Sequence, residues 1–135
     1  MKLTNAAIYD IIGAISKFNN AKGKTAFILF RTLRKLQEEI QDCDEQKNKL
    51  IQKYGKKDDE GFIISREDTE ATKKFMNEFT PILFYQIDVD IPRLTEEDFD
   101  ELENVDAPET NMMDYNIIYN FLVKGLEDTN IKTKK

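Results

Sequence analysis

The residues that could do chemistry in this chain are carboxylates, lysines and tyrosines, because the sequence contains no histidine. Histidine is the commonest general base and the commonest zinc ligand, and its absence excludes Ser-His and Cys-His nucleophile pairs. Asp88 and Asp90 lie on one face of a predicted strand, close to the acidic run that begins at Glu96. Such a pair could hold magnesium, but an exposed strand face gives the same pattern. We therefore expect no enzyme, no metal and no cofactor, with a carboxylate-metal enzyme as an alternative.

Two segments resemble ligand-binding loops but lack residues that those loops need. Gly23-Lys24-Thr25 matches the end of a phosphate-binding loop, yet Phe18 stands where its first glycine belongs, and a predicted helix precedes it instead of a strand. The segment 56–67 has acidic residues at several positions of a calcium loop, but Lys56 occupies the first, where a carboxylate is nearly obligatory. We interpret the first as a loop between helices and the second as a solvated turn.

Length and composition indicate a single folded domain. The chain has 135 residues, 40% hydrophobic and 34% charged, with nine Phe and five Tyr. It can therefore bury a core without disulfides and has too many aromatics for a disordered chain. The longest apolar run, 26–30, is too short to span a membrane, and the sequence opens without a stretch typical of a signal peptide. With one cysteine, Cys43, no internal disulfide can form, and we expect a cytoplasmic protein.

Hydrophobic spacing predicts an antiparallel pair of helices at the start of the chain. The first covers about 4–18, capped by Thr4 or Asn5, and the second covers about 25–54 and ends before Gly55. The second helix carries a heptad seam that outlasts the first helix. The end of that seam must therefore be covered by the C-terminal helix or by a second subunit, and we expect a homodimer. The predicted interface residues are Ile40, Cys43, Lys47, Leu50 and Tyr54.

The rest of the chain predicts three shorter helices and two strands, and so an α+β fold. Its helical hairpin, with a long heptad-bearing second helix, is joined by a small two- to three-stranded sheet and a C-terminal helix. Ser65, Thr95 and Thr110 are the predicted helix caps, and Pro81 is predicted to end a helix. We expect one domain over 1–126, followed by a flexible basic tail over 127–135. The further helices cover about 66–79, 95–103 and 111–124, and the strands about 61–65 and 82–91.

Charge is unevenly distributed along the chain. Residues 1–35 hold seven Lys and Arg against one Asp, whereas residues 86–114 hold eleven Asp and Glu against one Arg. Such asymmetry concerns partners and subunit contacts rather than fold. We expect the acidic segment to bind a basic protein; alternatively, residues 1–35 neutralise it within the fold or between subunits. The predicted partner-binding residues are Asp88, Asp90, Glu96, Glu97, Asp98, Asp100, Glu101 and Glu103.

The basic cluster could in principle contact phosphates. It lies around the start of the second predicted helix, within 22–35, and carries no interleaved pattern of aromatic residues and glycines. The whole chain is also acidic, with a net charge of −6. We therefore do not expect direct binding to nucleic acid. The cluster consists of Lys22, Lys24, Arg31, Arg34 and Lys35.

The order of several segments carries a resemblance. An opening Met1-Lys2-Leu3-Thr4-Asn5 leads into the helix pair, and residues 44–55 end in Lys53-Tyr54-Gly55. A charged turn at 57–61 and an acidic strand region at 86–94 follow. Over roughly residues 1–95 this layout resembles a small family of accessory proteins of unknown function from tailed phages and prophages of Gram-positive bacteria. The resemblance implies a phage origin and an accessory role in the host cytoplasm, and it brings no catalytic residues.

Taken together, these features predict a non-enzymatic phage accessory protein that acts by protein–protein binding. One form of this function is inhibition of a host defence protein, or of a protein that handles nucleic acid, because acidic surfaces compete for grooves lined with Lys and Arg. The unpaired heptad surface favours an alternative, a structural or assembly component of the virion. The partner would be a basic host or phage protein.

Overall fold

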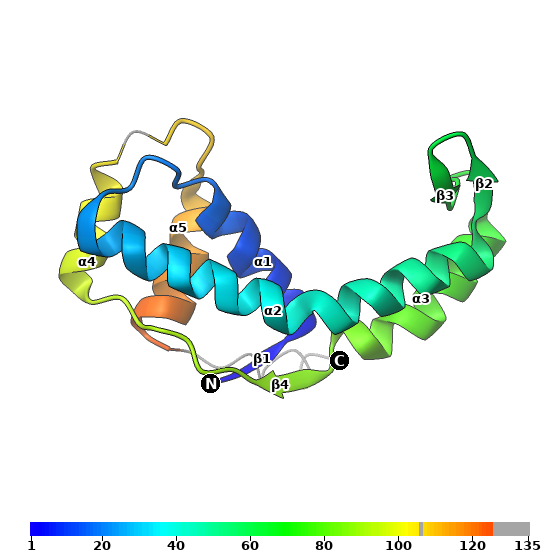
Figure 1. Ribbon diagram of the computed structural model, residues 1–135, viewed down its shortest axis with the longest axis horizontal. Coiled ribbons are helices and arrows are strands. Elements are labelled where there is room, and N and C mark those ends of the chain that lie inside the picture. Colours follow the sequence, from blue (N-terminus) through cyan, green and yellow to red (C-terminus); the bar gives the residue numbers. More distant parts are fainter. Residues whose placement is uncertain (106, 126–135) are drawn as a thin grey trace.

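The computed structural model describes residues 1–105 and 107–125, which form a lobe and an arm (Figure 1). The lobe is mostly helical, and the arm consists of two packed helices tipped by a β-hairpin. The predicted α+β fold and helical hairpin are confirmed, and the predicted tail at 127–135 lies outside the described residues. The elements are β1 (Lys2–Thr4), α1 (Asn5–Ser16), α2 (Gly23–Tyr54), β2 (Lys56–Asp58), β3 (Gly61–Ile63), α3 (Thr69–Leu83), β4 (Gln86–Asp88), α4 (Glu96–Glu103), α5 (Met112–Ile118) and the π-helix η1 (Tyr119–Val123).

The core of the lobe lies where α1, the first half of α2, α4 and the C-terminal helices meet. Thr4 caps α1, as predicted, by accepting a hydrogen bond from the backbone N–H of Ala7 at 3.1 Å. Apolar positions recur on the inner face of α1 at helical spacing, so one side of the helix is buried. The largest fully buried apolar side chains are Leu3, Ile8, Ile11, Leu36, Val89, Leu102, Ile118 and Leu122.

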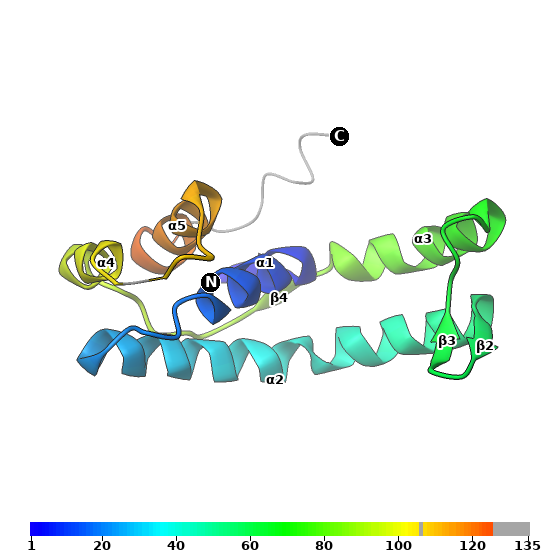
Figure 2. The same ribbon diagram turned by 90° about the horizontal axis from the view of Figure 1, so that it is seen from above.

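Helix α2 runs through both parts of the molecule, and α3 covers the half that α1 does not reach (Figure 2). Ile40, Cys43 and Leu50, three residues of the predicted subunit interface, are only 4%, 3% and 9% exposed. Their assignment to an interface is therefore wrong, because α3 and the lobe of the same chain bury them. The homodimer itself stays a prediction.

The two other predicted interface residues also have partners within the chain. The Nζ atom of Lys47 lies 5.8 Å from the centroid of the Tyr9 ring on α1. The hydroxyl of Tyr54 donates a hydrogen bond to Glu78 on α3. The end of the heptad seam is thus closed by a helix that sequence spacing did not assign to it.

The single predicted sheet is replaced by two separate two-stranded ladders. The segment 61–65 contributes β3, which pairs with β2 in the register Lys57 to Phe62. The segment 82–91 contributes only β4, which pairs with β1 in the register Leu3 to Ile87. A strand is as long as the partner that satisfies its backbone, and β1 has three residues. The predicted strand at 82–91 is therefore too long.

Helix α3 begins and ends later than predicted. Asp68 caps it by accepting from the N–H of Ala71 at 3.1 Å, whereas Ser65 accepts from Glu67 at 3.3 Å in the preceding turn. Pro81 does not end the helix. Proline removes one backbone donor, and the helix continues to Leu83.

Of two other predicted helix caps, the structure confirms one and corrects the other. The predicted cap at Thr95 is confirmed as part of a capping box, in which Thr95 accepts from the N–H of Asp98 at 3.1 Å. The predicted cap at Thr110 is wrong: Asn111 and Asp114 form the capping box of α5. The C-terminal helix also changes from α to π geometry at Tyr119.

Gly55 follows α2, as predicted, but with a φ of −86° it does not take the left-handed conformation of a typical helix stop. A glycine is needed here because there is no room for a side chain. A Cβ at this position would lie 2.5 Å from the carbonyl oxygens of both Ile51 and Ile63. Glycine therefore allows β3 to approach the end of α2.

Phe79 tests the packing of α3 on α2, because it is 6% exposed and stacks on Phe75 with ring centroids 5.3 Å apart. We expect Phe79→Ala to lower the free energy of unfolding by about 3–5 kcal/mol. Met76→Ala, on the same helix but with Met76 43% exposed, should cost less than about 1 kcal/mol. Urea denaturation followed by circular dichroism measures both. Equal, small effects would contradict the burial of the α2 seam by α3.

Candidate binding surfaces

Two of the eight predicted partner-binding carboxylates are bound to the start of α2. Asp98 is 5% exposed, accepts the backbone N–H of Thr95 at 3.0 Å, and lies 3.8 Å from the Nζ atom of Lys24. Glu101 accepts a hydrogen bond of 2.7 Å from the hydroxyl of Thr25, which is buried. These two acids therefore attach α4 to α2; Asp98 is buried, whereas Glu101 remains exposed while it accepts the bond from Thr25.

Two further acids also have partners within the chain. Asp88 pairs with the N-terminal ammonium of Met1 at 3.0 Å. Glu96 accepts a hydrogen bond of 2.7 Å from the hydroxyl of Tyr119, which raises the pKa of that tyrosine. Both carboxylates remain exposed, but part of their bonding capacity is already used.

Three ion pairs join the basic and acidic ends of the sequence. They link Met1 to Asp88, Lys24 to Asp98, and Lys17 to Asp114 at 3.0 Å. Each connects residues 1–35 with residues 86–114. Neutralisation within the fold, one of the two explanations offered by the sequence, therefore accounts for part of the charge asymmetry.

The other four acids are exposed and form no ion pair with any described residue. Asp90 and Glu97 stand apart, before α4 and in its first turn. Asp100 and Glu103 lie one turn apart on α4, with Glu103 near the first turn of α5 and Asp100 close enough to Tyr119 to contribute to its raised pKa. The predicted acidic surface of eight carboxylates is thus reduced to these four exposed ones.

A hollow of about 370 Å³ lies between α4 and α5, with Glu103 in its wall. Phe99 and Tyr115, in edge contact with centroids 6.3 Å apart, line it together with Glu103, Met112 and Asn116. Met112 is 76% exposed. We call Asp100, Glu103, Met112 and Asn116 the acidic methionine face. Such a face can receive an apolar side chain flanked by a positive charge.

The interpretation that the basic cluster carries no interleaved aromatic residues is wrong, because two exposed phenylalanines lie within it on α2. Phe27 and Phe30 are each 59% exposed, and the guanidinium of Arg31 lies 5.8 Å from the centroid of the Phe27 ring. Phe27, Phe30, Arg31 and Arg34 follow at i, i+3, i+4 and i+7, so they share one side of the helix. We call these four residues the phenylalanine–arginine face.

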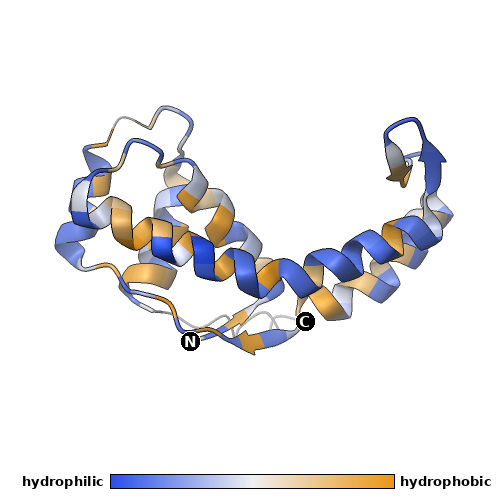
Figure 3. Ribbon diagram, in the orientation of Figure 1, coloured by the Kyte–Doolittle hydropathy of each residue, from blue (hydrophilic) through white to orange (hydrophobic). Residues whose placement is uncertain are grey.

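This face points away from the core. The buried residues of the same turns, among them Leu29 and Leu36, lie on the opposite side of α2. Every other element of the lobe also packs on that opposite side (Figure 2). Apolar and charged residues alternate along these exposed turns (Figure 3). The interleaved aromatics could have been found in the sequence by applying helical spacing to the outer face as well as to the inner one.

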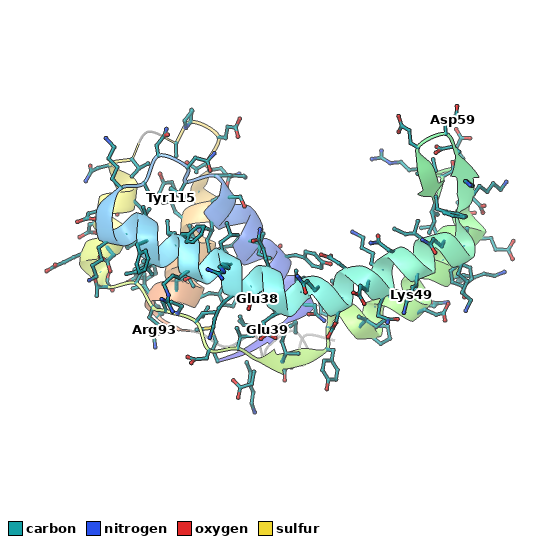
Figure 4. The ribbon with its side chains drawn as sticks, in the orientation of Figure 1. Glu38, Glu39, Lys49, Asp59, Arg93 and Tyr115 are labelled. Atoms are coloured by element: carbon teal, nitrogen blue, oxygen red, sulfur yellow. The ribbon has the colours of Figure 1, made fainter. Side chains whose placement is uncertain are left out.

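A third surface lies at the tip of the arm. A groove of about 510 Å³ between the β-hairpin, α2 and α3 is lined by Phe62, Ile63, Phe75 and Met76, with Lys47 and Arg66 at its edges. Phe62 and Ile63 are 42% and 52% exposed, and the apolar end of β3 is visible in Figure 3. Asp59 marks the outermost turn of this hairpin, far from Tyr115 in the lobe (Figure 4).

The segments that resemble ligand loops have other roles in the fold. At Gly23-Lys24-Thr25, the carboxylates of Asp98 and Glu101 contact the lysine and threonine, where they would repel a phosphate. The segment 56–67 forms the β2–β3 hairpin and the turn that follows it. Over the described ranges, no group of three acidic or cysteine side chains is placed to hold a metal ion.

Cys43 behaves as a core residue within the chain. It is buried, and its burial raises the pKa of the thiol, which disfavours the reactive thiolate. The neighbouring Tyr9 hydroxyl donates to Asp44, and burial together with this bond raises the pKa of Tyr9. Neither group is therefore poised as a nucleophile.

Comparisons of the chain with models of protein families, with curated proteins and with solved structures give no match. Among the described residues, no helix is both long enough and apolar enough to cross a membrane.

Asp98 should stabilise the fold in a pH-dependent way, because the hydrogen bond from Thr95 holds the pKa of its carboxyl below the usual range. We expect Asp98→Ala to lower the free energy of unfolding by about 2 kcal/mol at neutral pH. The contribution is complete above the unfolded-state pKa of about 3.9 and disappears as the pH falls through the lower folded-state pKa. The difference between wild type and variant should therefore close only in strong acid.

Asp100→Ala is the matched control, because Asp100 lies on the same helix but is exposed. It should change the free energy of unfolding by less than about 0.5 kcal/mol at any pH. Urea denaturation at a series of pH values measures both variants. If the two behave alike, the capping box and the contact with Lys24 do not hold α4 in place.

Proposed function

We propose that this protein acts by binding another protein, and that the acidic methionine face of α4 and α5 is the surface it uses. The observation that carries the proposal is the hollow with an aromatic floor between these helices, bordered by the exposed side chain of Met112 and the free carboxylate of Glu103. A methionine adapts its shape to an apolar partner, and unpaired carboxylates beside it attract a cation. Together they fit a basic protein surface with an apolar anchor.

The structure of the lobe supports restricting the proposal to this face. Asp98 and Glu101 serve the fold, so they are not counted as partner-binding residues in the proposal. Asp100 and Glu103 are free to meet a partner because their side chains form no ion pair with the rest of the described chain. The resemblance to phage accessory proteins is consistent with such a role, as is the prediction that the chain is not an enzyme.

A second candidate function, a structural or assembly component, is favoured by the arm. The groove at its tip carries exposed apolar side chains on a hairpin that projects away from the lobe (Figure 1). Assembly proteins join neighbours through such projecting contacts, whereas an inhibitor needs only one binding face.

The double substitution Asp100→Lys with Glu103→Lys should abolish partner binding while leaving the fold intact. Immobilised wild-type protein is incubated with a lysate of a Gram-positive bacterium, and the bound proteins are identified by mass spectrometry. We expect capture to weaken as salt rises, because electrostatic attraction is screened beyond about 10 Å at 0.1 M salt. The variant should lose the captured proteins and keep the helical circular dichroism signal.

Asp59→Lys with Glu60→Lys is the control, since it makes the same change of charge at the exposed hairpin turn of the arm. It should retain the captured proteins. If the Asp100 and Glu103 variant captures the same proteins as wild type, the acidic methionine face is not the binding surface and the proposal is wrong.

A further inference from the structure

The phenylalanine–arginine face is an exposed apolar surface that the proposed function does not use. Phe27 and Phe30 are each 59% exposed on the side of α2 opposite the core. Two neighbouring phenylalanines in solvent are unfavourable because apolar area is left in contact with water. Apolar groups gathered on one surface mark interaction sites more often than isolated ones do.

Its chemistry complements that of the acidic methionine face. One face offers aromatic rings beside Arg31 and Arg34, and the other offers a hollow with an aromatic floor, lined by Glu103 and with the exposed Asp100 one turn earlier on α4. Methionine sulfur and aromatic rings make favourable contacts. Arginine and carboxylate groups form paired hydrogen bonds. Each face therefore supplies the anchor and the charge that the other lacks.

We propose that the phenylalanine–arginine face of one copy docks into the acidic methionine face of a second copy. The inference rests on the proposed function, because it names the partner of that same surface. Phe27 or Phe30 enters the hollow beside Met112, and the arginines meet the carboxylates of α4. The contact is heterologous, since it joins two different surfaces.

The positions of the two faces determine what such a contact builds. Helix α2 borders one side of the molecule, and α5 lies on the other side of the lobe (Figure 2). A copy that has used one face keeps the other free. Head-to-tail contacts of this kind continue into an open chain or close into a ring, and do not stop at a two-fold dimer.

A second copy fits better than nucleic acid as the occupant of the phenylalanine–arginine face. Exposed aromatics beside arginines also stack on single-stranded bases. However, the chain has a net charge of −6, and Glu38 and Glu39 follow directly along the same helix (Figure 4). A phosphate backbone would be repelled there, whereas a compact acidic face meets only the two arginines.

Two variants that each lose one face provide the test. Phe27→Ser with Phe30→Ser removes the anchor, and Asp100→Lys with Glu103→Lys reverses the charge of the receiving face. All four side chains are exposed, so both variants should keep the wild-type melting temperature. Sedimentation velocity at protein concentrations up to about 100 µM detects association with a free energy of about −5.5 kcal/mol or stronger.

Wild type should sediment as species larger than the 15.8 kDa monomer, growing with concentration, while each variant alone stays monomeric. A one-to-one mixture of the two variants should form a heterodimer and stop there. The mixture contains one intact face on each partner, and the remaining two faces repel each other. Only a heterologous contact between these two surfaces predicts recovery from two inactive variants.

Three results would overturn the inference. Wild type could remain monomeric; the mixture could fail to form the heterodimer although wild type associates; or a labelled oligothymidine could bind wild type and not the Phe27 and Phe30 variant. A monomeric wild type that still captures another protein through Asp100 and Glu103 overturns only the head-to-tail contact. If wild type associates through these faces but capture from the lysate does not depend on Asp100 and Glu103, then the partner of the acidic methionine face is a second copy and no other protein.

Discussion

The length of α2 is the constraint on which the rest of the structure depends. Its 32 residues span about 48 Å, whereas the 12 residues of α1 and the 15 of α3 span about 18 Å and 22 Å. No single partner helix can cover its apolar seam, so two must follow one another along it. The lobe forms where α1 covers the first half, and the arm forms where α3 covers the second. The division of the molecule into two parts therefore follows from one helix that is longer than any partner.

The fold must also hold its short helices in place on α2. Helix α4 has eight residues and could not persist alone, because an isolated helix of that length is marginal in water. Its capping box and the contacts of Asp98 and Glu101 with the start of α2 fix its position. Carboxylates used in this way order the lobe and reduce the charge that reaches solvent. Position along α4 thus decides which acid of this segment is buried against α2, as Asp98 is, and which is exposed, as Asp100 is.

Local patterns were sufficient to predict the elements whose cause is local. Helical spacing located α1 and α2, and the Thr95 capping box located α4, because each signal lies within a few residues of the feature it specifies. The pairing of β1 with β4 and the packing of α3 on the second half of α2 join residues far apart in the chain, and no local pattern encodes them. Pro81 misled for a related reason: its local effect ends a helix, but the packing of α3 on α2 sustains it. Among the predicted site residues, sequence could identify the acids as a group but could not show that Asp98 is buried and Asp100 exposed.

The charge of the whole chain sets the conditions under which the proposed contact between two copies can form. Two copies with a net charge of −6 repel each other at long range, whereas the arginines and carboxylates of the two faces attract only at contact. Salt acts differently on these two effects, because the Debye length falls from about 30 Å at 0.01 M to about 8 Å at physiological ionic strength. Moderate salt therefore suppresses the general repulsion between copies before it weakens pairs in direct contact. The burial of Phe27 or Phe30 does not depend on this screening. The apolar contact would therefore hold two copies together once their repulsion is reduced. An association of this kind is weakest in very dilute salt, the opposite of what a simple basic partner on the acidic methionine face would show.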